Sequence, residues 1–187
     1  MTTLFIKNMV CNRCIMVVKS ELEQLGLSPV TVTLGEVELK ENNIDDKKEL
    51  LSERFQSLGF ELIDDKKSRI IEKIKNIIIN LVHRQNNDTK INLSDILSNQ
   101  LHHDYNYLSN LFSEVEGITI EKYFIAQRIE KVKELLVYGE LSLSEIAFKM
   151  NYSSVAYLSN QFKKVTGLTP SHFKQIKEDK RKPLDKV

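Results

Sequence analysis

The spacing of hydrophobic and polar residues predicts a small mixed α/β region in the first third of the chain. Apolar residues alternate along the strand-like stretches, and they recur every three to four residues along the helix-like ones. In order, the pattern predicts a strand at 4–9, a helix at 14–25, a hairpin at 30–39, a helix at 44–58 and a strand at 60–63. This β-α-β-β-α-β order is that of a split βαβ sandwich, with both helices on one face of a four-stranded sheet.

From Lys67 onward the pattern becomes helical, and it contains an internal repeat. An apolar stripe predicts a helix from Ile70 to Arg84, followed by a loop at 85–89. Segments 93–119 and 143–169 then align without a gap, with 11 identities in 27 positions. A predicted helix at 120–137 joins the two copies, and a polar tail follows at 177–187.

Each copy has the pattern of a helix-turn-helix unit. Ser142 and Glu145 fit a capping box at the start of the second copy, and a short turn follows the first helix. The next helix carries two apolar anchors four residues apart, Leu108 and Phe112 in one copy and Leu158 and Phe162 in the other. One face of this second helix is therefore predicted to pack on the core, and the opposite face is free to enter a major groove of DNA. The simpler alternative is that these units only pack together within a helical domain.

Residues 67–176 resemble the DNA-binding domain of AraC/XylS-type transcription regulators. The resemblance rests on Arg128, Ile129, Val132, Leu135, Leu136, Ile146, Ala147, Ser154, Tyr157, Ser159, Phe162, Lys163, Lys164, Gly167, Thr169, Pro170 and Phe173. It implies two helix-turn-helix units that bind one face of a double-stranded promoter site. Homodimerisation and contact with RNA polymerase stay open. Asn151 occupies the turn position where the family usually has glycine, and Asn tolerates a positive φ.

The exposed positions of the two second helices are the predicted DNA contacts. For base contacts these are Tyr105, Asn106, Ser109, Asn110, Val155, Ala156, Ser159 and Asn160. Asparagine can pair with adenine through two hydrogen bonds, and Val or Ala can contact thymine methyl groups. Phosphate contacts are predicted for Ser94, Ser144, Lys163 and Lys164. Glu114 replaces lysine in the first copy, so this copy is expected to hold phosphate more weakly.

Charge is divided unevenly along the chain. Residues 1–66 carry a net charge of −4 and residues 67–187 a net charge of +5. The second region can therefore tolerate a polyanion, although ordinary solvated surfaces account for the charge equally well. Because the sequence contains neither a signal peptide nor an apolar run long enough to span a membrane, we expect a cytoplasmic protein.

The two cysteines form a C-x-x-C motif, Cys11 and Cys14, where the first strand gives way to the first helix. In a reducing compartment such a pair more often binds a metal or has a redox role than forms a structural disulfide. The helix dipole and the nearby Arg13 favour thiolates, which select soft ions such as Cu(I) or Zn(II). With two sulfur ligands the site is open, unlike a closed structural zinc site.

Residues 3–65 resemble a heavy-metal-associated domain, the module of copper chaperones and metal-transporting ATPases. The resemblance rests on the element order, on the Met9-x-Cys11-x-x-Cys14 motif and on Phe60 beside the predicted metal loop. It implies a ferredoxin-like fold and a soft metal ion, with Cu(I) favoured over Zn(II), at Cys11 and Cys14. Asn8 and Val10 replace the usual Gly and Thr beside Met9. Thiol redox sensing and the absence of any ligand remain alternatives.

The sequence thus predicts a heavy-metal-associated-like domain at 1–66, an all-α double helix-turn-helix domain at 67–176 and a tail at 177–187. The favoured function is a sequence-specific AraC-type transcription regulator that responds to a soft metal ion. The alternative is a metal-carrier or thiol-redox module whose helices serve protein interaction. We do not expect an enzyme, because no phosphate-binding loop or nucleophile-base arrangement is found and the four histidines are scattered or lie in turns.

Overall fold

The computed structural model describes residues 1–63, 65–84 and 92–176. Its contacts divide the chain into two units, residues 1–76 and residues 77–187, and each is described by itself. Among the described residues, no helix has both the length and the apolar character needed to cross a membrane. The loop predicted at 85–89 and the tail predicted at 177–187 lie outside the described residues.

The first unit contains a four-stranded antiparallel sheet with the strand order β2-β3-β1-β4. The predicted order of strands and helices is confirmed. The elements are β1 (Thr2–Lys7), α1 (Asn12–Gln24), β2 (Pro29–Thr33), β3 (Glu36–Leu39), α2 (Asp45–Ser57) and β4 (Glu61–Leu62). The first strand lies in the interior of the sheet and pairs with both β3 and β4.

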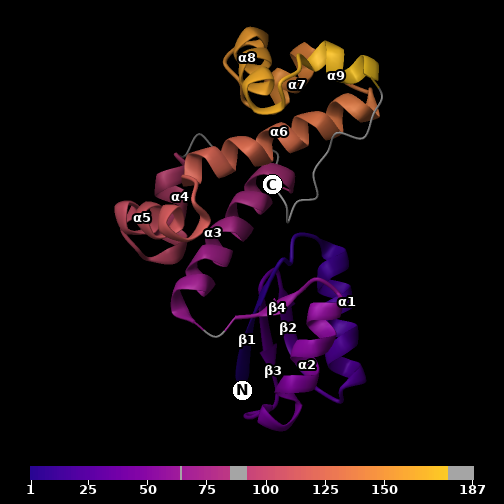
Figure 1. Ribbon diagram of the computed structural model, residues 1–187, viewed down its shortest axis with the longest axis vertical. Helices are drawn as coiled ribbons and strands as arrows, with labels where there is room; N and C mark the ends of the chain where they lie inside the picture. The colour runs from indigo at the N-terminus through magenta and orange to yellow at the C-terminus, as the bar shows by residue number, and fades with distance from the viewer. Residues whose placement is uncertain (64, 85–91, 177–187) are drawn as a thin grey trace. The chain divides into compact units, whose positions relative to one another are not determined.

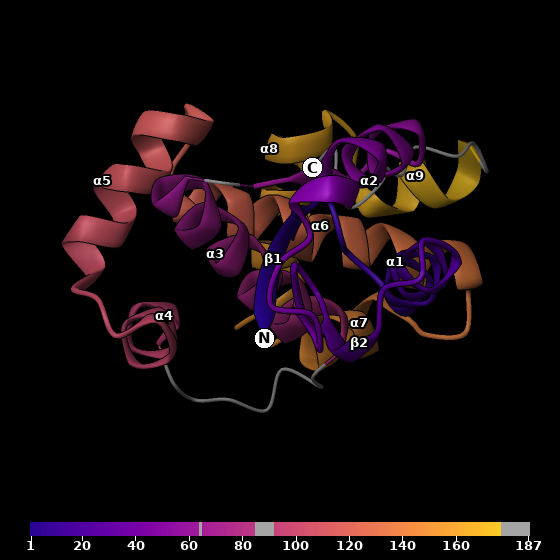
Figure 2. The ribbon, with the colours of Figure 1, turned by 90° about the horizontal axis from the view of Figure 1, so that it is seen from below.

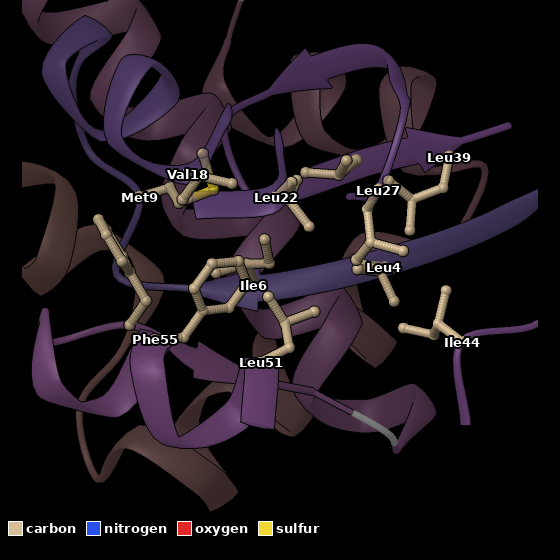
Figure 3. Close-up of a cluster of buried hydrophobic side chains, with 12 residues drawn as sticks. Leu4, Ile6, Met9, Val18, Leu22, Leu27, Leu39, Ile44, Leu51 and Phe55 are labelled. Atoms are coloured by element: carbon tan, nitrogen blue, oxygen red, sulfur yellow. The ribbon is translucent and has the colours of Figure 1, made fainter. Parts of the chain in front are cut away.

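The core of this unit lies between the sheet and the helices α1 and α2, which lie side by side (Figures 1 and 2). Leu4 and Ile6 alternate along β1 and point into this core, where they meet Val18 and Leu22 of α1 and Phe55 of α2 (Figure 3). Full burial of one such side chain contributes roughly 1.5–3 kcal/mol to stability. The alternation of apolar residues in β1 is therefore explained by one buried face.

The other face of β1 carries part of α3 (Lys66–His83). Phe5 alternates with the core residues of β1, and the Arg69 guanidinium lies 4.3 Å from the centre of its ring. Asn76 donates a hydrogen bond to the carbonyl of Leu34, with a distance of 3.1 Å. Because of these contacts the division between the two units falls inside α3, ten residues beyond the boundary predicted at residue 66.

The second unit is entirely helical over its described residues. After the last part of α3 it contains α4 (Leu93–Leu101), α5 (Tyr105–Glu116), α6 (Ile120–Tyr138), α7 (Leu143–Lys149), α8 (Val155–Thr166) and α9 (Pro170–Ile176). The pairs α4–α5 and α7–α8 are the two repeated copies, and α6 joins them as predicted (Figure 1). The helix α9 is an addition to the predicted elements, and it follows the second copy as α6 follows the first.

The repeat extends to the packing of its aromatic residues. Phe112 of α5 and Phe162 of α8 are both fully buried, which confirms their predicted role as anchors. Phe112 packs against Tyr123 with a ring-centre distance of 5.6 Å, and Phe162 packs against Phe173 at the same distance. The two copies therefore share one packing design, in which the second helix rests on the helix that follows it.

Candidate functional site

The turn between α4 and α5 is set by two residues with special backbone roles. His102 ends α4 with a left-handed φ of 54°. Asp104 then caps α5, since its carboxylate accepts hydrogen bonds from the backbone N–H groups of Asn106 (2.8 Å) and Tyr107 (3.4 Å). Such a cap typically contributes about 1 kcal/mol and fixes where the helix begins.

The second copy uses the equivalent positions with different side chains. Ser142 and Glu145 form the predicted capping box at the start of α7. Asn151 has a φ of 51°, so it adopts the positive backbone angle that was expected at this turn. Ser154 caps α8 by accepting a hydrogen bond of 3.0 Å from the N–H of Tyr157. Both turns are thus built from local hydrogen bonds, and each presents the first turn of its second helix.

The outward faces of α5 and α8 carry most of the polar side chains of these helices, because the apolar anchors lie on their inward faces. Among the predicted base contacts, Asn106 and Asn110 on α5 are exposed, as are Ala156 and Asn160 at the matching positions of α8. The remaining four lie half-buried at the edges of these faces: Tyr105, Ser109, Val155 and Ser159. The centre of the outward face is therefore formed by Asn106 and Asn110 on α5, and by Ala156 and Asn160 on α8.

Tyr105 is engaged within its own domain. Its hydroxyl donates a hydrogen bond to the carboxylate of Glu121, in the first turn of α6. Burial raises the pKa of the Tyr105 hydroxyl, and the hydrogen bond to Glu121 raises it further. A contact between Tyr105 and a base would have to replace this hydrogen bond.

Two exposed tyrosines are not among the predicted contacts. Tyr107 and Tyr157 occupy the same position in the two copies, and their side chains are 46% and 52% exposed. Each lies in the first turn of its helix, next to an aromatic ring of the preceding turn, His103 for Tyr107 and Tyr152 for Tyr157. Their identity in the repeat was visible in the sequence, but an aromatic residue beside a buried leucine is usually interpreted as part of a core.

The predicted phosphate contacts are distributed unequally between the copies. Lys163 and Lys164 are exposed near the end of α8, and Ser144 is exposed in the first turn of α7. Ser94 is half-buried in the first turn of α4. Glu114 is exposed at the position that matches Lys164, so the outward face of α5 carries a negative charge where α8 carries a positive one.

Arg128 of α6 holds the end of α7 in place. Its guanidinium donates a hydrogen bond to the carbonyl of Met150 and lies 4.0 Å from the ring centre of Tyr152. Arg128→Met is expected to lower the free energy of unfolding by about 1–3 kcal/mol, because methionine provides neither the donor nor the charge over the ring. Denaturant titration of the full chain measures this change. Arg128→Lys, which keeps the charge but lacks the planar group, should have an intermediate stability, and equal stability of all three proteins would contradict the assignment.

The thiol pair lies at the start of α1. Cys11 is the residue before the helix and Cys14 lies in its first turn, with 3.5 Å between their sulfur atoms. Burial raises the pKa of the Cys11 thiol, but hydrogen bonds from Cys14 and the nearby Arg13 lower it by more, so the net pKa lies below its usual value. Burial raises the pKa of the Cys14 thiol, backbone hydrogen bonds of Val10 and Cys11 lower it, and the Cys11 thiol raises it again, so the net pKa lies above its usual value. Cys11 is therefore the first of the two to become a thiolate.

The two residues predicted to flank the thiols lie in the hydrophobic core. Met9 is fully buried, and Phe60 is 7% exposed and packs edge-on against Phe55 with a ring-centre distance of 6.1 Å. Within residues 1–63, 65–84 and 92–176, no group of three or more His, Cys, Asp or Glu side chains is positioned to hold a metal ion. The protein therefore offers two sulfur donors at this site. Two half-buried thiols in contact, one with a lowered pKa, suit a soft ion that leaves positions open.

Comparisons with known proteins concern the helical part of the chain. Residues 97–176 match a family model described as a helix-turn-helix domain. The C-terminal domain of AraT, a response regulator from Geobacillus stearothermophilus, is 27% identical, with a TM-score of 0.50, over 60% of this chain and 88% of that one. The C-terminal domain of the two-component response regulator yesN from Fusobacterium nucleatum is 33% identical, with a TM-score of 0.46, over 55% of this chain and 98% of that one.

A DNA-binding transcriptional dual regulator from Escherichia coli K-12 shares the fold, with 17% identity and a TM-score of 0.50 over 62% of this chain and 97% of that one. No curated protein sequence matches the chain. The family match begins inside α4 and ends with α9, so it contains both second helices and the long helix between them. By this match, and with two helix-turn-helix copies joined by α6, residues 97–176 form an AraC-type helix-turn-helix domain, similar to the C-terminal domain of the AraT response regulator.

Proposed function

We propose that the chain binds specific promoter sequences through both helix-turn-helix units at once. The observation that carries this proposal is the matched pair of polar faces on α5 and α8, each fixed to its own core by a buried phenylalanine. The joining helix α6 has 19 residues, or about 28 Å at ~1.5 Å per residue. Successive major grooves on one side of B-DNA lie ~34 Å apart, so a connector of this length suits two adjacent grooves.

We further propose that a soft metal ion at Cys11 and Cys14 regulates this DNA binding. The strand order and the position of the thiol pair at the start of α1 support the interpretation of the first unit as a ferredoxin-like, heavy-metal-associated-like domain. Cu(I) is the favoured ion, since thiolates select it and two donors do not complete a structural zinc site. When bound, the ion would supply a positive charge and a cross-link between the two sulfur atoms. The chain itself holds the two half-buried thiols of Cys11 and Cys14 in contact, ready for such an ion.

Selection of bound sites from random duplex DNA, at fixed salt and with or without Cu(I) under reducing conditions, tests both parts. Enrichment of a common sequence supports specific binding, and a change in affinity with Cu(I) supports regulation. The absence of any enriched sequence would favour the alternative, in which the first unit carries metal or electrons and the helices bind protein.

The double variant Cys11→Ser, Cys14→Ser separates the two parts. Without Cu(I) it should bind the selected site within about twofold of the wild type, because neither cysteine lies in the helix-turn-helix units. With Cu(I) its affinity should not change. Fluorescence anisotropy with the selected duplex measures both quantities, and a Cu(I) response that survives in the double variant would rule out the thiol pair as the sensor.

A further inference from the structure

The first part of α3 contacts the sheet through a polar stripe. Arg69, Glu72, Lys73 and Asn76 are spaced so that they share one face of the helix. At one end of this stripe the Lys73 ammonium lies 3.0 Å from the carboxylate of Glu36, at the start of β3. Asn76 contacts the adjacent turn between β2 and β3. The helix is thus held on the outer face of the sheet by side chains that sequence patterns usually place in solvent.

At Glu72 the same stripe reaches the segment that leads to the thiols. Glu72 is only 6% exposed, and its carboxylate interacts with the backbone N–H of Asn8 and with Lys7, at the end of β1. Its charge is also paired with Lys75, one turn further along α3, at 3.4 Å. Burial raises the pKa of Glu72, and the interactions with Lys75, Asn8 and Lys7 oppose this effect. A buried carboxylate facing a backbone N–H of the loop fixes the position of both.

Asn8 joins this loop to a second element. Its φ is 70°, and its side-chain amide donates a hydrogen bond of 2.9 Å to the carbonyl of Gly59, in the turn between α2 and β4. Met9 follows and is fully buried. Asn8, three residues before the first thiol, is therefore held on one side by the turn at Gly59 and on the other by Glu72 of α3. Only two residues separate Asn8 from Cys11. A displacement of Cys11 on ligand binding would therefore move Asn8 and, through it, Glu72 of α3.

We propose that Glu72 is a positioning residue for the thiol loop, and that occupancy of Cys11 and Cys14 changes how the first part of α3 is held on the sheet. The proposal rests on the proposed metal response. The helix α3 runs without a break from Lys66 to His83, and its residues from 77 onward belong to the helical unit. One helix thus connects the part that contacts the sheet with the second unit. Within the polar stripe, the interaction of Glu72 with Asn8 is then the latch through which the state of the thiols reaches the rest of the chain.

Hydrogen exchange of the full chain, with and without Cu(I) under reducing conditions, tests this latch. In the wild type, Cu(I) should change the exchange rates of amides in residues 66–76 by tenfold or more. In Glu72→Ala this change should fall below twofold, while Cu(I) affinity, measured by competition with a coloured Cu(I) chelator, stays within about tenfold of the wild type. Glu72→Gln retains an oxygen that can face the Asn8 N–H and should restore a large part of the response.

Lys73→Ala is the matched control, because it removes a contact of the same stripe that does not touch the thiol loop. It should leave the Cu(I)-dependent change in exchange at the wild-type level. The proposal would be overturned if Lys73→Ala and Glu72→Ala lost the Cu(I)-dependent change in exchange equally. It would also be overturned if bound Cu(I) left the exchange rates of residues 66–76 unchanged in the wild type. If the wild type binds no Cu(I), the metal response itself fails, and this inference with it. If Cu(I) binds and shifts DNA affinity equally in the wild type and in Glu72→Ala, the role of Glu72 is rejected while the proposed metal response stands.

Discussion

Phe162→Ala is expected to destabilise the second helix-turn-helix unit by about 3–5 kcal/mol and to abolish tight DNA binding. The Phe162 ring is fully buried and packs against Phe173, so its removal leaves a cavity beneath α8. A loss of this size is comparable with the whole stability of many small domains. Denaturant titration gives the change in stability, and anisotropy at fixed salt gives the change in affinity.

The chain provides two matched controls for this substitution. Phe148 lies on α7 with 85% of its side chain exposed, so Phe148→Ala should change stability by no more than about 0.5 kcal/mol. Phe112→Ala removes the equivalent anchor of the first copy and should cost as much stability as Phe162→Ala. Its effect on DNA affinity should be smaller, because α8 carries Lys163 and Lys164 where α5 carries Ser113 and Glu114. Equal losses of affinity from the two anchor variants would contradict the role of the second copy as the stronger binding unit.

The elements that could be predicted from sequence are those whose apolar residues face a single core. Alternation in β1 and the four-residue spacing of Leu158 and Phe162 each identify one buried face, and all of these anchors are buried. The repeat added information that no single segment provides, because a second copy with the same spacing supports both helix-turn-helix assignments. Local capping by Ser142 and Glu145 was predictable for the same reason, since the motif needs no distant partner.

The sequence could not predict contacts made by polar residues across long separations. Arg69 and Lys73 have the pattern of a solvated helix face, yet Arg69 stacks on Phe5 and Lys73 pairs with Glu36. Which strand residue meets them depends on the packing of α3, and no local pattern encodes this. The predicted boundary at residue 66 therefore falls ten residues before the division that the contacts make.

The candidate DNA-binding surface shows the same limit on a smaller scale. Asn106, Asn110 and Asn160 are exposed because the anchors on the opposite helix face fix the orientation, and this follows from spacing alone. The bond between Tyr105 and Glu121 joins two helices, so the helical pattern of α5 does not reveal it. The exposure of Tyr107 and Tyr157 depends on how far each ring leans out of its helix, which spacing also leaves undetermined.

Asn160→Ala is expected to weaken binding to the selected site by about 10–100-fold and to leave binding to unrelated duplexes unchanged. Asn160 is exposed at the centre of the outward face of α8, where an amide can make two hydrogen bonds to an adenine edge. A pair of such bonds contributes roughly 1–3 kcal/mol of discrimination, which corresponds to this range of affinity. Anisotropy titrations with the selected and a scrambled duplex, at the same salt concentration, measure the ratio directly.

Lys163→Ala is the matched control for Asn160→Ala, since Lys163 lies on the same helix and is also exposed. A lysine that contacts phosphate should weaken binding to both duplexes alike and should reduce the salt dependence by about one counterion. The equivalent change in the first copy, Asn110→Ala, should also lower specificity, but over a different part of the site, one groove away. If Asn160→Ala and Lys163→Ala both weakened the two duplexes equally, Asn160 would contact the backbone, and base recognition would have to be assigned to other residues of α8.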